Sequence, residues 1–181
     1  KRKWRHTVWH GNCTRTGSLL HPQDQRSTLM FTIVLLEPQI PPNTGSTGRL
    51  CGATNTRLHI VGRLGFKLSD KTLKRAGLDN WDHIDWGYFP DLEQYCENMV
   101  KNETFHLLTT KSSHPYTSRC FRKGDHLVFG SETAGINEAF LKKHWDNTCT
   151  IPMDNPHIRS LNLATSVGIV LYEAIRQIHV F

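Results

Sequence analysis

The sequence predicts an α/β fold in which a parallel β-sheet carries helices on both of its faces. The first observation is alternation: from residue 30 onward, short apolar segments alternate with segments of helical pattern, and no segment is repeated. The second observation is that glycine-rich or polar loops follow the apolar segments, notably after Glu37, Thr109, Gly130 and Met153. Ligands of parallel sheets bind beyond the carboxyl ends of the strands, so a functional site is expected in these loops.

The predicted strands are short, apolar and rich in β-branched residues, as is typical of buried strands. The first, "LMFTIVLLEP", ends at Pro38, which has no backbone N–H to donate. We expect strands at residues 29–38, 57–61, 84–89 (the weakest pattern), 104–110, 125–131 and 148–153.

Segments of helical pattern separate these strands. We expect helices at residues 43–55, 69–78, 91–100, 137–144 and 161–178. Asn43 or Thr44 is the candidate amino-terminal cap of the glycine-rich first helix. Ser69 or Asp70 is the candidate cap of the basic second helix. The last helix carries one apolar stripe, formed by Ala164, Gly168, Leu171, Ile175 and Ile178.

Length and composition predict a single domain. A chain of 181 residues with 38% hydrophobic content buries one core. Residues 1–28 differ from the rest: they hold six of the 22 basic side chains, one of the 16 acidic ones, and no apolar period. We interpret them as a disordered, non-core extension, with a nucleic-acid arm or a transit segment as the alternatives. Residues 29–181 form the predicted domain.

Several classes of protein and site are disfavoured. No apolar run reaches the roughly 18 residues that a membrane-spanning helix requires. The five cysteines are an odd number without a CxxC pair, which favours reduced thiols in the cytoplasm over disulfides or structural zinc. The eleven histidines show no metal-ligand spacing, so we expect no metal.

Two loops carry residues suited to ligand binding. The glycines of "FGSETAGI" leave backbone N–H and C=O groups open to the close approach of a flat ligand. Its Glu132 can hold a neighbouring loop, bind a ligand hydroxyl, or stay solvated. "NTGSTGR" places Arg49 on a helix after two glycines, where a plain surface cation is the alternative. GxGxxG, GxxxxGK[ST] and GxSxG are all absent, which disfavours dinucleotide, P-loop and serine-hydrolase sites.

Taken together, the motifs resemble a known family. "EPQIPPNTG…R", "LHIV…LGF…DKTLKRAGLD", "FGSETAGI" and "IPM…IRSLNLATSVGIVLYEAIRQ" are similar, in unbroken order from about Met30 to Ile178, to the SPOUT superfamily of RNA methyltransferases. More narrowly, they resemble tRNA wobble-nucleoside 2′-O-methyltransferases of the TrmL (YibK) type. The resemblance implies an α/β fold with a C-terminal deep trefoil knot, and a homodimer with paired active sites. It also implies S-adenosylmethionine bound in a bent form against the knotted loops.

The resemblance also assigns roles to individual residues. The positions that would hold the cofactor are Leu108, Gly130, Glu132, Ile151 and Ser160. The positions matching catalytic, substrate-handling or dimer residues are Arg49, Arg159 and Tyr172, and those expected to contact the substrate are Asn43, Ser46 and Asn162. Leu171, Tyr172 and Ile175 would pack against a second subunit or the core. One departure is Ser46, which offers a hydroxyl where the family usually has the amide of Thr-Gly-Asn.

The implied reaction is methylation of the ribose 2′-hydroxyl at the wobble nucleotide of tRNA, a cytidine or a modified uridine. An arginine stays charged and is a poor base, so we expect Arg49 to stabilise developing alkoxide charge or to clamp a phosphate. Two alternatives stay open: a non-catalytic RNA-binding module of the same fold, and a 2′-O-methyltransferase acting on another tRNA or rRNA position. A dinucleotide-dependent oxidoreductase is disfavoured because GxGxxG is missing.

Overall fold

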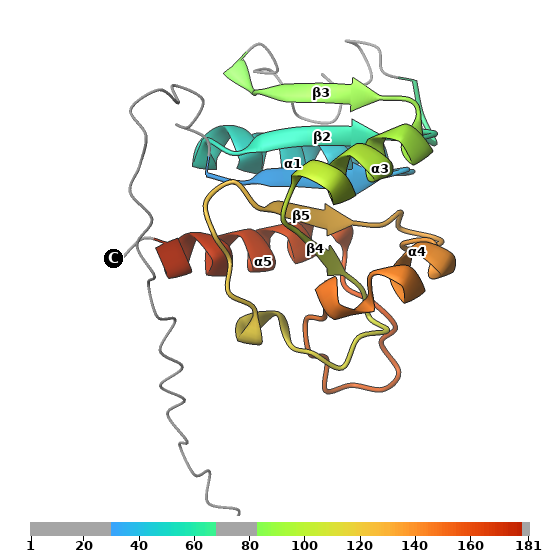
Figure 1. Ribbon diagram of the computed structural model, residues 1–181, viewed down its shortest axis with the longest axis vertical. Coiled ribbons are helices and arrows are strands. Elements are labelled where there is room, and N and C mark those ends of the chain that lie inside the picture. Colours follow the sequence, from blue (N-terminus) through green and yellow to red (C-terminus); the bar gives the residue numbers. More distant parts are fainter. Residues whose placement is uncertain (1–29, 68–82, 179–181) are drawn as a thin grey trace, which may run out of the picture.

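The computed structural model describes residues 30–67 and 83–178 (Figure 1). Within these residues, six parallel strands form one sheet in the order β3-β2-β1-β5-β4-β6. Their bounds are β1 Thr32–Leu36, β2 Arg57–Val61, β3 Trp86–Phe89, β4 Phe105–Leu108, β5 His126–Phe129 and β6 Thr148–Cys149. The predicted extension, the boundary at residue 28 and the helix at 69–78 with its caps Ser69 and Asp70 lie outside the described residues.

Helices cover both faces of the sheet, which confirms the predicted α/β class. Their bounds are α1 Pro41–Thr54, α3 Leu92–Asn102, α4 Glu138–Lys143 and α5 Leu163–Ile178, with short 3-10 turns η2 at Tyr116–Ser118 and η3 at Trp145–Asn147. Figure 1 shows α3 and α4 in front of the sheet and α1 and α5 behind it.

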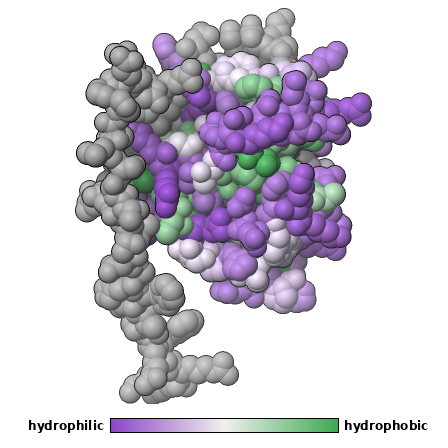
Figure 2. Space-filling model, viewed as in Figure 1, coloured by the Kyte–Doolittle hydropathy of each residue, from purple (hydrophilic) through white to green (hydrophobic). Residues whose placement is uncertain are grey.

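Each face of the sheet has its own apolar core, because alternate strand residues point to opposite faces. Ile33, Leu58 and Leu127 join α1 and α5 in the larger core. Val34 and Val128 join α3 and α4 in the smaller core. The surface on the α3 and α4 side is mainly hydrophilic, with a strip of hydrophobic residues in its middle (Figure 2).

Helix α1 starts earlier than predicted. It begins at Pro41, and Ile40 occupies the cap position without a side-chain hydrogen bond. Proline suits this first position because its fixed φ is helical and its missing N–H is not needed there. The candidate caps Asn43 and Thr44 were therefore wrong: both are buried inside the helix.

Helix α5 also differs from its predicted form. It begins at Leu163 rather than 161, and the Asn162 side chain accepts a hydrogen bond from the Thr165 N–H at 3.2 Å. Of the predicted stripe, Leu171 and Ile175 are buried, whereas Ala164, Gly168 and Ile178 are only partly buried. The buried face is instead Leu163, Val167, Val170, Leu171, Ala174 and Ile175, because α5 packs against both β5 and α1.

Candidate functional site

A cavity of about 480 Å³ lies at the carboxyl edge of the sheet, where the prediction places a ligand site. The loops after β1, β4, β5 and β6 converge on it, together with the first turn of α5. The predicted site residues that line it are Asn43, Leu108, Gly130, Glu132, Ile151, Arg159, Ser160 and Asn162. These residues are spread from 43 to 162 in the sequence, and the fold gathers them around one space.

The loop after β5 folds back on itself, and this turn depends on glycine. Backbone hydrogen bonds join Ser131 and Gly135 in both directions, at 2.9 and 3.2 Å. A Cβ on Gly130 would lie 2.1 Å from the carbonyl carbon of Gly135, so no larger residue fits there. Gly135 has φ of 68°, in the left-handed region. The loop therefore presents backbone to the cavity, as the open-backbone interpretation predicts.

Glu132 holds this loop to the start of α1. Its carboxylate accepts hydrogen bonds from the backbone N–H of Gln39 at 2.8 Å and of Ile40 at 3.3 Å. It also accepts a hydrogen bond from the Asn43 side-chain amide at 2.8 Å. A carboxylate at a helix amino terminus also interacts favourably with the helix dipole. The start of α1, which has no side-chain cap of its own, is thus held in place by a side chain from a distant loop.

The same chain of hydrogen bonds continues to α5. The Asn162 amide donates to the Asn43 carbonyl oxygen at 2.9 Å, while its own carbonyl oxygen caps α5. Glu132, Asn43 and Asn162 thus connect the β5 loop, α1 and α5 across one wall of the cavity. We call these three residues the site network.

Three predicted site residues do not line the cavity. Ser46 and Arg49 are exposed on α1, further along the helix than Asn43. Tyr172 is 55% exposed on α5, so the core alternative for this residue was wrong. Its neighbours Leu171 and Ile175 are buried in the core of the same chain and are not available to a second subunit.

Lys111 also lines the cavity and was not predicted as a site residue. Its ammonium pairs with the Glu138 carboxylate at the start of α4, and both side chains are largely exposed. The hydrogen bond from Lys111 lowers the pKa of the Glu138 carboxyl. The available sequence signal was the "TTK" that follows the end of β4.

The sequence pattern of the SpoU rRNA methylase family matches residues 30–172. The chain belongs to this family. The predicted resemblance to RNA methyltransferases of the SPOUT type is thereby confirmed. Similar relatives include the tRNA (cytidine(34)-2′-O)-methyltransferase of Methylovorus glucosotrophus, which is 45% identical over 149 residues, 82% of this chain and 96% of the relative.

Two solved structures share this fold. One structure, described as giving insight into 2-OH methylation of C/U34 on tRNA, has a TM-score of 0.77 and 38% identity, and the match covers 83% of this chain and 97% of the other. The SpoU methyltransferase AviRb of Streptomyces viridochromogenes, solved with AdoMet, has a TM-score of 0.69. At 23% identity, over 81% of this chain and 57% of AviRb, this second similarity concerns the fold alone.

Two further features concern only residues 30–67 and 83–178. They contain no group of three or more His, Cys, Asp or Glu side chains placed to hold a metal ion. They also contain no helix with the length and apolar character needed to cross a bilayer.

Proposed function

We propose that this SpoU methylase transfers a methyl group from S-adenosylmethionine to the ribose 2′-hydroxyl of the wobble nucleotide of tRNA. The observation that carries the proposal is the cavity at the carboxyl edge of the sheet, which gathers residues from three separated motifs. The 45% identity to a tRNA (cytidine(34)-2′-O)-methyltransferase supports the choice of substrate.

The cavity suits S-adenosylmethionine in size and chemistry. Its volume of about 480 Å³ is within the usual range for sites of small ligands. Gly130 contributes to the cavity lining, and Leu108 and Ile151 add apolar surface. When bound, S-adenosylmethionine supplies a methyl group on a positively charged sulfur that leaves as a neutral thioether.

The residues of the chain would position the ribose and stabilise charge. Within the described residues, the Glu132 carboxylate bonds to the segment before α1 and to Asn43, which makes Glu132 a positioning residue. Arg159 borders the cavity and Arg49 lies on the same helix as Asn43. As the nucleophilic hydroxyl loses its proton, a guanidinium at the reacting oxygen would stabilise the negative charge that develops there.

A homodimer would explain the residues outside the cavity. Ser46, Arg49 and Tyr172 all lie on α1 and α5, the two helices that cover one face of the sheet. Pairing of two copies through these helices would cover Tyr172 and bring Arg49 to a composite site. Sedimentation at micromolar concentration should then give twice the mass of 20.8 kDa, and a species of 20.8 kDa alone would contradict the dimer.

The C-terminal knot belongs to the same proposal. After β6 at the sheet edge, residues 150–162 pass the cavity loops, and α5 then returns to the middle of the sheet beside β5 and α1. This return path is what a threaded segment requires. We also propose that the protein acts in the cytoplasm, a compartment that suits the buried cysteines Cys51, Cys96 and Cys149, which form no disulfide with one another.

The direct test is methyl transfer to total tRNA with the modified nucleoside mapped. We expect one 2′-O-methylated nucleotide at the wobble position. The transfer assay, together with calorimetric titration of S-adenosylmethionine and NADH, separates the alternatives: a non-catalytic RNA-binding module transfers no methyl group, and an oxidoreductase binds NADH. Methylation at a different tRNA or rRNA position would contradict the proposed substrate but not the reaction.

A further inference from the structure

A second cavity, of about 340 Å³, lies between α3 and the face of the sheet that α3 covers. It shares no lining residue with the first cavity. Asp91, Gln94, Asn98 and Asn102 line it at helical spacing of three or four residues, so it runs as a groove along α3. The opposite wall comes from β2, β3 and the start of β5.

The floor of the groove is a cluster of rings. The centroids of His59 and Phe89 are 4.7 Å apart, and those of Phe89 and Tyr95 are 5.0 Å apart. His59 Nδ1 forms a 2.7 Å hydrogen bond with the Tyr95 hydroxyl, which fixes both rings. A floor of packed rings offers apolar faces to methylene groups and negative π-density to cations.

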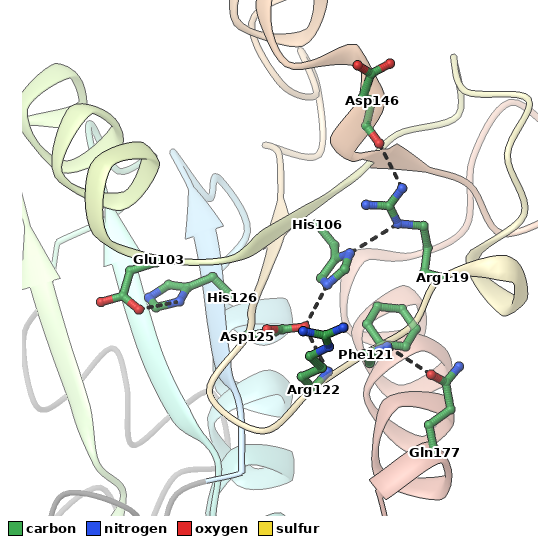
Figure 3. A network of polar contacts seen from close by, with 9 residues as sticks. All are labelled: Glu103, His106, Arg119, Phe121, Arg122, Asp125, His126, Asp146 and Gln177. Atoms are coloured by element: carbon green, nitrogen blue, oxygen red, sulfur yellow. Dashed lines mark hydrogen bonds and ion pairs between the residues drawn. The ribbon is translucent and has the colours of Figure 1, made fainter. Parts of the chain in front are cut away.

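His126 has an unsatisfied nitrogen at one end of this groove. The residue is only 7% exposed, and its Nδ1 is buried without a hydrogen-bond partner. The Glu103 carboxylate faces it at 3.9 Å (Figure 3), which is too long for a hydrogen bond. Buried nitrogens are normally paired, so a donor that reaches both His126 and Glu103 is the missing partner.

The charge of the groove selects the kind of donor. Among its lining residues the carboxylates are Asp91 and Glu103, and Lys and Arg are absent from the lining. Burial lowers the pKa of His59 to about 4 and lowers that of His126, so both imidazoles are neutral at pH 7. The carboxylates stand at opposite ends of α3, about 18 Å apart along its axis at 1.5 Å per residue. An anion is therefore excluded, and a chain with positive charges at separated points fits.

We propose that this groove binds a linear aliphatic polyamine. One ammonium group donates to both His126 Nδ1 and the Glu103 carboxylate, since an ammonium carries three N–H donors and no acceptor. The methylene chain lies over Phe89 and Tyr95, and a further ammonium approaches Asp91. A metal ion is a poorer occupant because, in the described part of the chain, no metal-holding group of three His, Cys, Asp or Glu side chains occurs.

The test is calorimetric titration of spermidine into the full-length protein, freed of nucleic acid, with the His126 ring signals followed by NMR. We expect saturable binding and a shift of the His126 signals. Glu103→Gln should weaken binding about tenfold, the loss of one charge-assisted hydrogen bond. His126→Phe, which keeps a ring but removes the acceptor, should weaken it similarly.

The matched control is Glu93→Gln, which removes the same charge from an exposed position of α3 that does not line the groove. It should change the affinity less than twofold. If Glu93→Gln and Glu103→Gln weakened spermidine binding equally, the proposal would be overturned, because spermidine would then be attracted by the overall charge of the surface and not by this groove. Absence of saturable binding at millimolar spermidine would also overturn it. If butylamine, which has one ammonium group, bound as tightly as spermidine, the second ammonium site near Asp91 would be refuted. The test requires neither S-adenosylmethionine nor tRNA, so its outcome is independent of the proposed function.

Discussion

Two polar networks lie at opposite edges of the sheet, and they differ in what surrounds them. At the carboxyl edge, Glu132, Asn43 and Asn162 border a cavity. At the amino edge, His106 and Asp125 are buried, with 3% and 4% exposure, and border neither of the two cavities described above. Figure 3 shows this second group, which we call the closed network: His106, Asp125, Arg119 and the carbonyl of Asp146.

Four hydrogen bonds hold the closed network together. Asp125 Oδ2 accepts from His106 Nε2 at 2.9 Å and from the Arg122 N–H at 2.8 Å. Arg119 donates through Nε to His106 Nδ1 at 3.2 Å and through Nη1 to the Asp146 carbonyl at 2.8 Å. Because arginine can only donate, His106 Nδ1 carries no proton and Nε2–H donates to Asp125.

The comparison shows that hydrogen-bonded networks of similar side chains can either stabilise the fold or shape a functional site. Both networks join segments that are distant in the sequence. The closed network centres on the buried side chains of His106 and Asp125, so its loss should affect folding. The site network borders open space, so its loss should affect activity. Substitutions in and around the two networks test this division.

Arg49→Ala tests whether a residue outside the cavity takes part in the chemistry. If Arg49 stabilises charge in the transition state, methyl transfer should fall on the order of 10²–10³, with S-adenosylmethionine affinity within a few-fold of wild type. Single-turnover rates and cofactor titration measure the two quantities. If Arg49 only clamps a phosphate, saturating tRNA should restore most of the rate, and Arg49→Lys should keep part of it. Near-normal turnover at subsaturating tRNA would make Arg49 a surface cation and Arg159 the leading candidate.

Glu132→Ala should reduce methyl transfer on the order of 10²-fold, because the start of α1 and Asn43 lose the carboxylate that positions them. Glu97→Ala is the matched control: Glu97 is an exposed carboxylate on α3 and should leave the rate within twofold. Rates are to be compared with unfolding curves of the same variants. A loss of stability without a loss of rate would break the division between the two networks.

Asp125→Ala should lower the free energy of unfolding by about 2–3 kcal/mol, because the His106 ring and the Arg122 N–H lose their buried acceptor. Asp85→Ala, which breaks the exposed Arg57–Asp85 pair, should cost about 0–1 kcal/mol. Urea unfolding measures both. The comparison would fail if the two substitutions had equal effects, or if folded Asp125→Ala protein were inactive.

The smallest change in stability is expected when the pH is lowered. Burial lowers the folded-state pKa of His59 from 6.5 to about 4, so between these values the unfolded chain binds a proton that the folded chain does not. The contribution of His59 is complete above pH 6.5 and is lost as the pH falls. The loss is about 1 kcal/mol over the first pH unit below 6.5. Urea unfolding at the two ends of this first pH unit should show the loss of stability. The variant His59→Gln, which cannot titrate, should lose less stability over the same pH unit. An unchanged slope in His59→Gln would assign the acid sensitivity to other groups.

Most of the described elements, and the chemistry of the loops between them, could be predicted from the sequence. Alternating apolar strands and helical segments fixed the parallel α/β class, and the glycines of "FGSETAGI" marked a backbone-lined loop. These features are local, because strand period, proline and glycine act on neighbouring residues. The placement of most predicted site residues around one cavity followed from strand ends meeting at one edge of the sheet.

The contacts between distant segments are visible only in the folded protein. The start of α1 is held by Glu132, whose hydrogen bond to Asn43 spans 89 positions, and the Asn43–Asn162 bond spans 119. The buried face of α5 is rotated from the predicted stripe because the helix packs on α1 as well as on the sheet. The polar groove under α3 combines residues from β2, β3, β5 and α3. Hydrogen-bond partners and packing faces of this kind depend on which surfaces the fold brings together, and local sequence does not encode that information.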